Sequence, residues 1–310
     1  MKPIYSFKKA RINYLKKKMF FCSLFLLAIT INVPKSYGQT NYQLFGIPVM
    51  TDPNVIRGNT YGGENALQML NGIHNTAIGT DALKSNKGDG LLYGNYNTAI
   101  GSSTLLNNTR GRANTAIGYA ALYKDTSGYD NTANGVDALY SNLSGNFNTA
   151  FGVDALYDNT TAHENVGLGE RALRFHKTGD NNTAVGNHSL ENNVAGANNT
   201  AVGFEALDNN NGNRNTAIGN WSGYNNKVGD SNVFLGYEAG YNETGSNKLY
   251  IANSKSSALI YGDFRAGNVG IGTTNPLTSL SITPSVFGTK ITLVDAGNTL
   301  NHCGFGVSSL

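Results

Sequence analysis

The stretch Asn114-Thr115-Ala116-Ile117-Gly118-Tyr119-Ala120-Ala121-Leu122 decides the fold, because variants of it recur along most of the chain. The shared phrase is Asn-Thr-Ala-Ile-Gly, then two variable residues, then Ala-Leu. Its first residue recurs at Asn59, Asn75, Asn97, Asn114, Asn131, Asn148, Asn165, Asn182, Asn199, Asn215 and Asn232. Most steps are 17 residues, and one step of 22 predicts a protruding loop around Asn86–Leu92. A fixed period of this length is typical of a solenoid, in which each repeat stacks on its neighbour.

The composition favours turns and strands over helices. Of the 310 residues, 44 are Asn and 38 are Gly, and both types disfavour helix interiors. A hydrophobic share of 40% argues against simple disorder. The sequence therefore predicts an all-β chain, a parallel β-roll or β-solenoid of about eleven 17-residue coils followed by a small β collar. Each coil is expected to contain two short strands, one at Thr-Ala-Ile and one at Ala-Leu.

Stacking in register places like residues in columns along the rod. We expect the column that begins each phrase to form a ladder of Asn amides. Two apolar columns are expected to fill the interior of the coils. The Ile column is Ile78, Ile100, Ile117, Phe151, Val185, Val202 and Ile218. The Leu column is Leu67, Leu83, Leu105, Leu122, Leu139, Leu156, Leu173, Leu190 and Leu207.

Two apolar columns give each coil only a thin interior, which predicts a further apolar interface between chains. Small side chains let neighbouring sheets pack closely, so we expect the Ala column to form an oligomer interface. That column is Ala77, Ala99, Ala116, Ala150, Ala184, Ala201 and Ala217. The alternative is that Ala faces the interior and Ile faces the partner chain.

Three tyrosines suggest a contact surface on the outside of the rod. Tyr123, Tyr140 and Tyr157 occupy one register on consecutive coils, 17 residues apart. Because Tyr is enriched in interfaces, they form a candidate binding patch. The alternative is that they stack as a structural ladder.

The first 38 residues have the pattern of a secretory signal peptide. Seven basic residues and no acid precede an apolar run of about 15 residues, Met19–Val33, and Gly38 ends a small-residue cleavage site. Cleavage after Gly38 leaves 15 basic and 20 acidic residues, a net charge of −5. The mature chain is then expected to be secreted or at the cell surface, without a transmembrane segment. Its negative charge argues against a nucleic-acid partner.

With eleven registered copies, the repeated phrase resembles the head repeats of trimeric autotransporter adhesins, the YadA-like head, over residues 59–245. The resemblance implies a left-handed parallel β-roll, three chains packed around one axis, and a surface that binds host matrix or other cells. The following stretch, with Lys248-Leu249-Tyr250-Ile251 and Asn268-Val269-Gly270-Ile271-Gly272, is similar to the collar in phage tail-fibre-like and bacterial surface proteins.

These inferences divide the chain into five parts. They are a signal peptide (1–38), an N-terminal lead-in (39–58), the head repeats (59–245), a β collar (246–282) and the start of an incomplete β segment (283–310). The expected function is a secreted or surface-exposed adhesin-like structural and binding protein, homotrimeric and non-enzymatic. Its ligand would be host matrix, a cell surface or a glycan. The alternative is a tail-fibre-like receptor- or glycan-binding protein that lacks its C-terminal chaperone domain.

No motif in the sequence predicts catalysis, a metal site or a cofactor. The five His fall on different registers without metal-ligand spacing, and Cys303 is the single cysteine of the mature chain. A polysaccharide-acting enzyme would need clustered carboxylates on one face, and the columns offer Asp137 and Asp154. We therefore expect no catalytic residues, no metal ligands and no cofactor.

Overall fold

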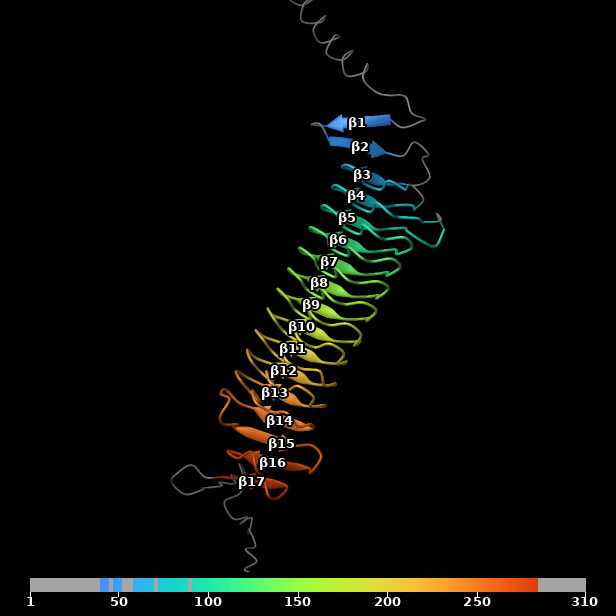
Figure 1. Cartoon of the computed structure of the whole chain (residues 1–310). Helices are drawn as coiled ribbons and strands as arrows, with labels where there is room; N and C mark the ends of the chain where they lie inside the picture. The colour runs from blue at the N-terminus through green and yellow to red at the C-terminus, as the bar shows by residue number, and fades with distance from the viewer. Residues whose placement is uncertain (1–39, 45–46, 52–57, 70–71, 89–90, 284–310) are drawn as a thin grey trace, which may run out of the picture.

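The protein is a stack of short β-strands. The computed structural model describes residues 40–44, 47–51, 58–69, 72–88 and 91–283, and every regular element in them is a strand. Figure 1 shows the strands lying one above another in an elongated rod. The expected signal peptide, the segment 284–310 and Cys303 lie outside the described residues. Within the described part, no helix is long and apolar enough to span a membrane.

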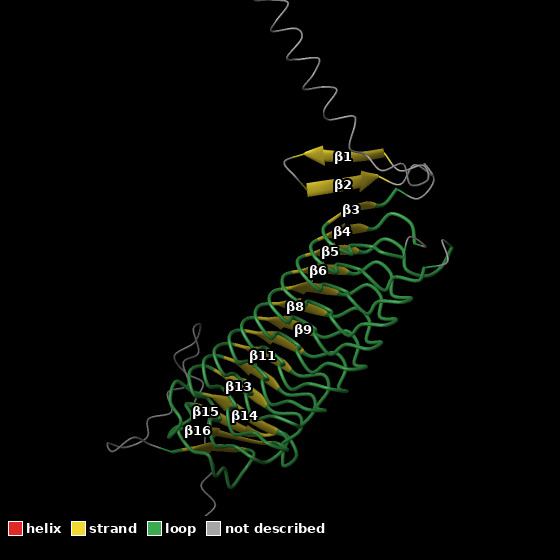
Figure 2. Cartoon of the chain, turned by 45° about the horizontal axis from the view of Figure 1, so that its top comes forward, coloured by secondary structure: helices red, strands yellow, loops and turns green. Residues whose placement is uncertain are grey.

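The repeat region forms a parallel β-solenoid of about eleven coils, as the period predicts. Each coil contributes one three-residue strand, and like residues pair in register, for example Thr98 with Thr115 and Ala99 with Ala116. Figure 2 shows these strands aligned along the rod, with turns completing each coil. The strands are β3 (Thr60–Gly62), β4 (Thr76–Ile78), β5 (Thr98–Ile100), β6 (Thr115–Ile117), β7 (Thr132–Asn134), β8 (Thr149–Phe151), β9 (Val166–Leu168), β10 (Thr183–Val185), β11 (Thr200–Val202), β12 (Thr216–Ile218) and β13 (Val233–Leu235).

The two ends of the stack pair differently from its middle. At the N-terminal end, β1 (Thr40–Leu44) and β2 (Ile47–Thr51) form an antiparallel hairpin, and β2 pairs antiparallel with β3. The segment expected as a collar contains β14 (Lys248–Ile251), β15 (Ile260–Asp263), β16 (Asn268–Ile271) and β17 (Leu280–Ile282). There β14 continues the parallel stack, β15 and β16 pair antiparallel, and β17 pairs parallel with β16.

The expectation of two strands per coil is wrong, because the Ala-Leu segment forms a turn. Ala120 and Leu122 have φ values of +51° and +53°, so the backbone curls instead of extending. The turn still bonds to the next coil, since the Leu122 N–H donates to the Ala138 carbonyl at 3.0 Å. Residues with a left-handed backbone conformation at alternate positions thus close the coil, and the turn still forms hydrogen bonds along the rod.

Gly118 shows why each strand must end in glycine. Its φ is +126°, a region that side chains rarely adopt, and a Cβ there would lie 2.5 Å from the Gly135 carbonyl oxygen. The equivalent glycines of the other coils meet the same obstacle, because consecutive turns lie directly on one another. Glycine at this register therefore sets the close spacing of the coils.

The interior of each coil is built from Ala and Leu, and the predicted places of Ala and Ile are exchanged. Ala116 is fully buried, whereas its neighbour Ile117 is 36% exposed. A strand alternates its faces, so Thr115 and Ile117 point outward together while Ala116 points inward. The Leu column is buried as predicted. Leu side chains fill most of the thin interior, which leaves room for a methyl group at the facing position.

The Ala column is therefore not an oligomer interface. Its members have no exposed surface within a single chain: Ala77, Ala99, Ala116, Ala150, Ala184, Ala201 and Ala217. A second chain could not touch them without opening the coils. The alternative, Ala inside and Ile outside, agrees with the burial, and the face available to a partner is the Ile column.

The predicted Asn ladder is present. The Asn131 N–H donates to Oδ1 of Asn114 on the preceding coil at 3.0 Å, and Asn131 Nδ2 donates to the Gly145 carbonyl at 2.8 Å. The same backbone-to-amide bond recurs at neighbouring coils, and these side chains are buried. Each buried amide thus satisfies its own polar atoms and those of the chain around it.

Candidate functional site: the outer surface of the coils

An apolar ribbon follows the strands on the outside of the rod. It consists of the outward apolar residue of most strands and, on some coils, the residue two positions later, on the far side of the glycine. The strand members are Ile78, Ile100, Ile117, Phe151, Leu168, Val202 and Ile218, and the others are Tyr119, Val136, Val153, Phe204 and Tyr237. Their exposed fractions run from 36% at Ile117 to 58% at Tyr119. Large apolar side chains exposed in a row along a surface are typical of interaction sites.

The tyrosine patch has the geometry that its register predicts. Tyr123 and Tyr140 stack with ring centroids 5.0 Å apart, and Tyr140 and Tyr157 stack at 5.1 Å. The planes of the rings are nearly parallel, and the side chains are half-buried. Lys124 lies over the Tyr140 ring, with Nζ 5.0 Å from its centroid. Burial raises the pKa of the Tyr140 and Tyr157 hydroxyls, so both remain neutral donors at physiological pH.

A row of charged residues continues from the tyrosines along the rod. Arg174 occupies the tyrosine register on the next coil, and its Nε lies 3.4 Å from Asp154 Oδ2. Burial, followed by repulsion from Asp154, raises the pKa of Asp137. The repeat register places Arg174 after Tyr157, so the sequence indicates a positive charge at this end of the tyrosine patch. A cation therefore closes the C-terminal edge of the tyrosine patch.

Three more carboxylates lie further along this row. Glu191 contacts His188 through Oε2, and Glu205 Oε2 accepts a hydrogen bond from Trp221 Nε1 at 2.9 Å. Burial and the nearby charges of Glu191 and Glu205 raise the pKa of Asp208 to about 7. Within the described residues no group of His, Cys, Asp or Glu is arranged to hold a metal ion. The row is a partly buried acidic surface held by hydrogen bonds and ion pairs.

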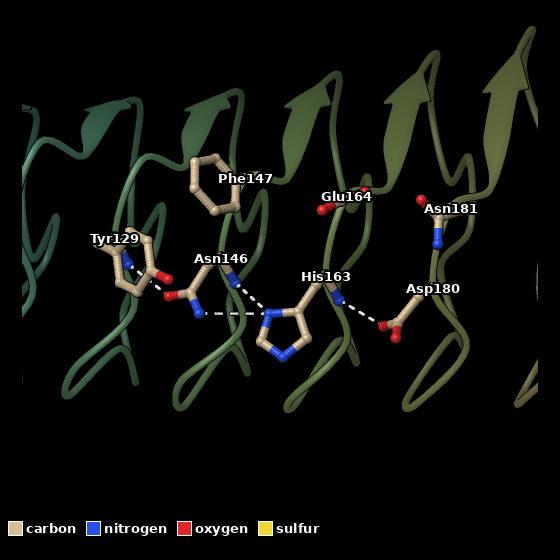
Figure 3. A pocket seen from close by; sticks show the side chains of 7 residues that line it. All are labelled: Tyr129, Asn146, Phe147, His163, Glu164, Asp180 and Asn181. Atoms are coloured by element: carbon tan, nitrogen blue, oxygen red, sulfur yellow. Dashed lines mark hydrogen bonds between the residues drawn. The ribbon is translucent and has the colours of Figure 1, made fainter.

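A shallow groove of about 390 Å³ lies on the turns of the middle coils (Figure 3). Its floor is a chain of hydrogen bonds between coils: the Tyr129 N–H donates to Asn146 Oδ1, the Asn146 N–H to His163 Nδ1, and the His163 N–H to Asp180 Oδ1. Because Nδ1 of His163 accepts, the proton of the neutral ring lies on Nε2. The polar groups of this groove serve the stacking of the turns.

A second buried polar column, which the sequence analysis missed, lies under the turns. Its register follows the Leu column by three residues and holds Asn86, Asn108, Asp125, Asn142, Asn159, His176, Asn193, Asn210 and Asn226. Amides in it donate to Oδ1 of the preceding coil, as from Asn159 to Asn142 at 2.9 Å. The recurrence of Asn at this register was readable from the sequence. Asp125 and His176 are the departures from it.

Asp125 fits this column as a neutral acid. Its Oδ1 accepts from Asn142 Nδ2 at 2.9 Å and from the Gly128 N–H at 3.1 Å. Its Oδ2 takes the place of a donating amide nitrogen, and neither that atom nor Asn108 Oδ1 has a partner. A proton on Oδ2 would satisfy both atoms. Burial raises the pKa of Asp125 well above its usual range, in agreement with this assignment.

We expect Asp125→Asn to remove a loss of stability at high pH. Because folding raises the pKa of Asp125, its contribution is complete below pH 4 and is lost as pH rises through the folded-state pKa. An isosteric amide donates without a titrating proton and avoids an unsatisfied buried group, which costs about 1–3 kcal/mol. Thermal unfolding between pH 5 and 9 should show the variant gaining on the wild type as pH rises. The exposed Asp130→Asn is the control, and parallel pH profiles for wild type and Asp125→Asn would contradict the assignment.

No protein-family model, no curated protein and no solved structure matches this chain. The solenoid therefore rests on the strand pairing and burial described above.

Proposed function

We propose that the protein is a secreted or cell-surface adhesin-like head, in which three chains pack side by side through the apolar ribbon and the outer turns contact the ligand. The observation that supports this most is the ribbon itself, a row of large aliphatic and aromatic side chains exposed on a regular sheet. In a lone chain this surface would remain in water. Burying it between chains is favourable roughly in proportion to the apolar area removed from water.

A closed three-fold arrangement suits this surface. The outward strand residues recur on nearly every coil, so parallel chains can repeat the same contact along their length. Three copies around one axis leave no ribbon uncovered, whereas an open chain of copies would continue without limit. The turns that carry the tyrosine patch are separate from the strands and remain available to a ligand. The trimer is also what the YadA-like resemblance implies.

The first test is the mass of the mature chain, residues 39–310, measured by size-exclusion chromatography with light scattering. We expect three times the mass of one chain. A monomer at micromolar concentration would contradict the proposed assembly.

The adhesive contact is expected to involve the tyrosine patch. Replacing Tyr123, Tyr140 and Tyr157 together by Ser removes three stacked rings, and truncating an aromatic hot spot commonly costs about 2 kcal/mol or more. Binding to matrix proteins or cells should therefore fall at least about tenfold, while the β circular dichroism signal persists. Surface plasmon resonance on immobilised matrix proteins measures the binding.

Tyr224 and Tyr241 supply a matched control for this variant. They stack with centroids 5.0 Å apart at the same register on later coils. Replacing both by Ser should leave binding unchanged if the patch is specific. If the triple variant unfolds, the tyrosines serve as structural ladder packing; if it folds and binds normally, the adhesive surface lies elsewhere.

A further inference from the structure

The charges of the head are unevenly distributed along the rod. Residues 84–127 contain five basic residues against two acids, one of which is the buried Asp125. Residues 128–245 contain five basic residues against 13 acids. A negatively charged ligand would therefore be attracted to the early coils and repelled by the later ones.

A groove of about 650 Å³ lies within this basic region, where the inserted loop joins the turns of the next two coils. It is lined by Lys87, Tyr93, Thr109, Arg110, Thr126 and Ser127. Hydrogen bonds fix both ends of the loop: the Lys87 N–H donates to the Thr109 carbonyl at 3.2 Å, and the Gly94 N–H donates to the Arg110 carbonyl at 3.2 Å. The backbone at Lys87 and at Gly94 is thus tied to the next coil.

Among the residues that the structure describes, no carboxylate neutralises the two cations of this groove. Among the described residues, no carboxylate forms an ion pair with Lys87 or Arg110, and both side chains are exposed. The Arg110 guanidinium lies 5.9 Å from the centroid of the Tyr93 ring, which is 41% exposed. Ser127 is also exposed and adds a hydroxyl group to the rim.

We propose that this groove binds acidic sugar units, carrying carboxylate or sulfate groups, of a polysaccharide chain. Arg110 and Lys87 pair with the anionic groups, the Tyr93 ring packs against a sugar face, and Ser127 bonds to ring hydroxyls. The volume is in the range of pockets that hold small ligands. After the expected cleavage the chain carries a net charge of −5, and two cations in it are too few for a nucleic-acid track, which needs a series of phosphate contacts. The inference rests on the proposed adhesive function and names a ligand class for it.

The test compares the full chain with Lys87→Gln/Arg110→Gln. Binding of a sulfated glycosaminoglycan octasaccharide, an oligouronate, neutral dextran and inorganic sulfate is measured by calorimetry at 50 and 300 mM salt. Wild type should bind at least one acidic oligosaccharide, more weakly at high salt, and should not bind dextran. The variant should lose at least about tenfold in affinity, which is the scale expected for removing a charged hydrogen-bond partner.

A matched control lies at the same turn position on later coils. Lys177 and Lys227 directly follow the second buried polar column, as Lys87 does, and both are exposed. Lys177→Gln/Lys227→Gln removes the same charge outside the groove and should change the affinity by less than about twofold. Equal losses in both variants would reduce the effect to net charge and overturn the proposal. The preference between sulfate and carboxylate probes identifies the anionic group.

Three other outcomes overturn the proposal: no binding of either acidic oligosaccharide by wild type, equal binding of dextran, or equally tight binding of an oligoglutamate peptide. None of them affects the proposed assembly, because light scattering and tyrosine-patch binding are measured separately. A groove variant that keeps the wild-type mass and matrix binding but no longer binds the acidic glycan would separate the glycan groove from the proposed assembly and adhesion.

Discussion

Ile100→Asp combined with Ile117→Asp should convert the proposed trimer into folded monomers, whereas Ala116→Asp should destabilise the stack itself. Both isoleucines are more than a third exposed, so Asp in their place is solvated in a lone chain. At a three-fold contact, the same carboxylates would be desolvated next to their copies, which is strongly unfavourable. Light scattering should therefore report one third of the wild-type mass, with the β circular dichroism signal unchanged.

Ala116→Asp acts inside the chain and gives the opposite pattern. Ala116 is fully buried between the Ala side chains of neighbouring strands, so its carboxylate would have no partner. An uncompensated buried charge costs about 3–5 kcal/mol, which lowers the Tm of a domain of this size by about 10 °C. Thermal unfolding followed by circular dichroism measures the lower Tm.

Leu143→Asp is the control for the ribbon. Leu143 is 43% exposed but lies on a turn, away from the strands. It should leave both mass and stability unchanged. If the double isoleucine variant keeps the wild-type mass, the chains do not meet at the ribbon.

The sequence predicted the period, the parallel pairing and the Asn ladder, because a repeated residue can occupy only one environment in a stack. It could not decide which side of the strand faces inward. In Thr115-Ala116-Ile117 one face carries two β-branched residues and the other carries Ala, and transfer free energy alone favours burying Ile. The small space left beside Leu122 places Ala inside instead. The size of that space depends on how tightly the glycines close the coil.

The candidate sites also include features that the repeat register predicts and features that it does not. Tyr123, Tyr140 and Tyr157 were predictable, because one register fixes their stacking. The ion pair between Arg174 and Asp154 and the raised pKa of Asp125 depend on side-chain reach and burial, which a register does not give. The basic groove was not predictable either, since the inserted loop that follows Lys87 breaks the period there, and Arg110 lines the same groove from the next coil.

Phe234→Ala should be among the most destabilising changes in the rod, and two Gly→Leu changes should reverse much of it. Phe234 takes the Ala position on β13 and is fully buried. The Leu positions on either side are Gly223 and Gly240, and a Cβ at Gly223 would lie 2.5 Å from Phe234 Cδ2. One aromatic ring thus fills the space that two Leu side chains fill elsewhere. Removing it leaves a cavity that costs about 3–5 kcal/mol.

The triple variant Phe234→Ala/Gly223→Leu/Gly240→Leu restores the pattern of the other coils. Both glycines have φ near +62°, and Leu122 adopts +53° at the same register, so the backbone accepts Leu as it does elsewhere. The triple variant should recover most of the lost Tm in thermal unfolding, whereas Gly223→Leu alone should be destabilising because Phe234 occupies its space. A triple variant no more stable than Phe234→Ala would show that the exchange of one Phe for two Leu does not explain this core. Recovery would show that the interior depends on volume shared between two consecutive coils, which is why single positions of the repeat could not be assigned in isolation.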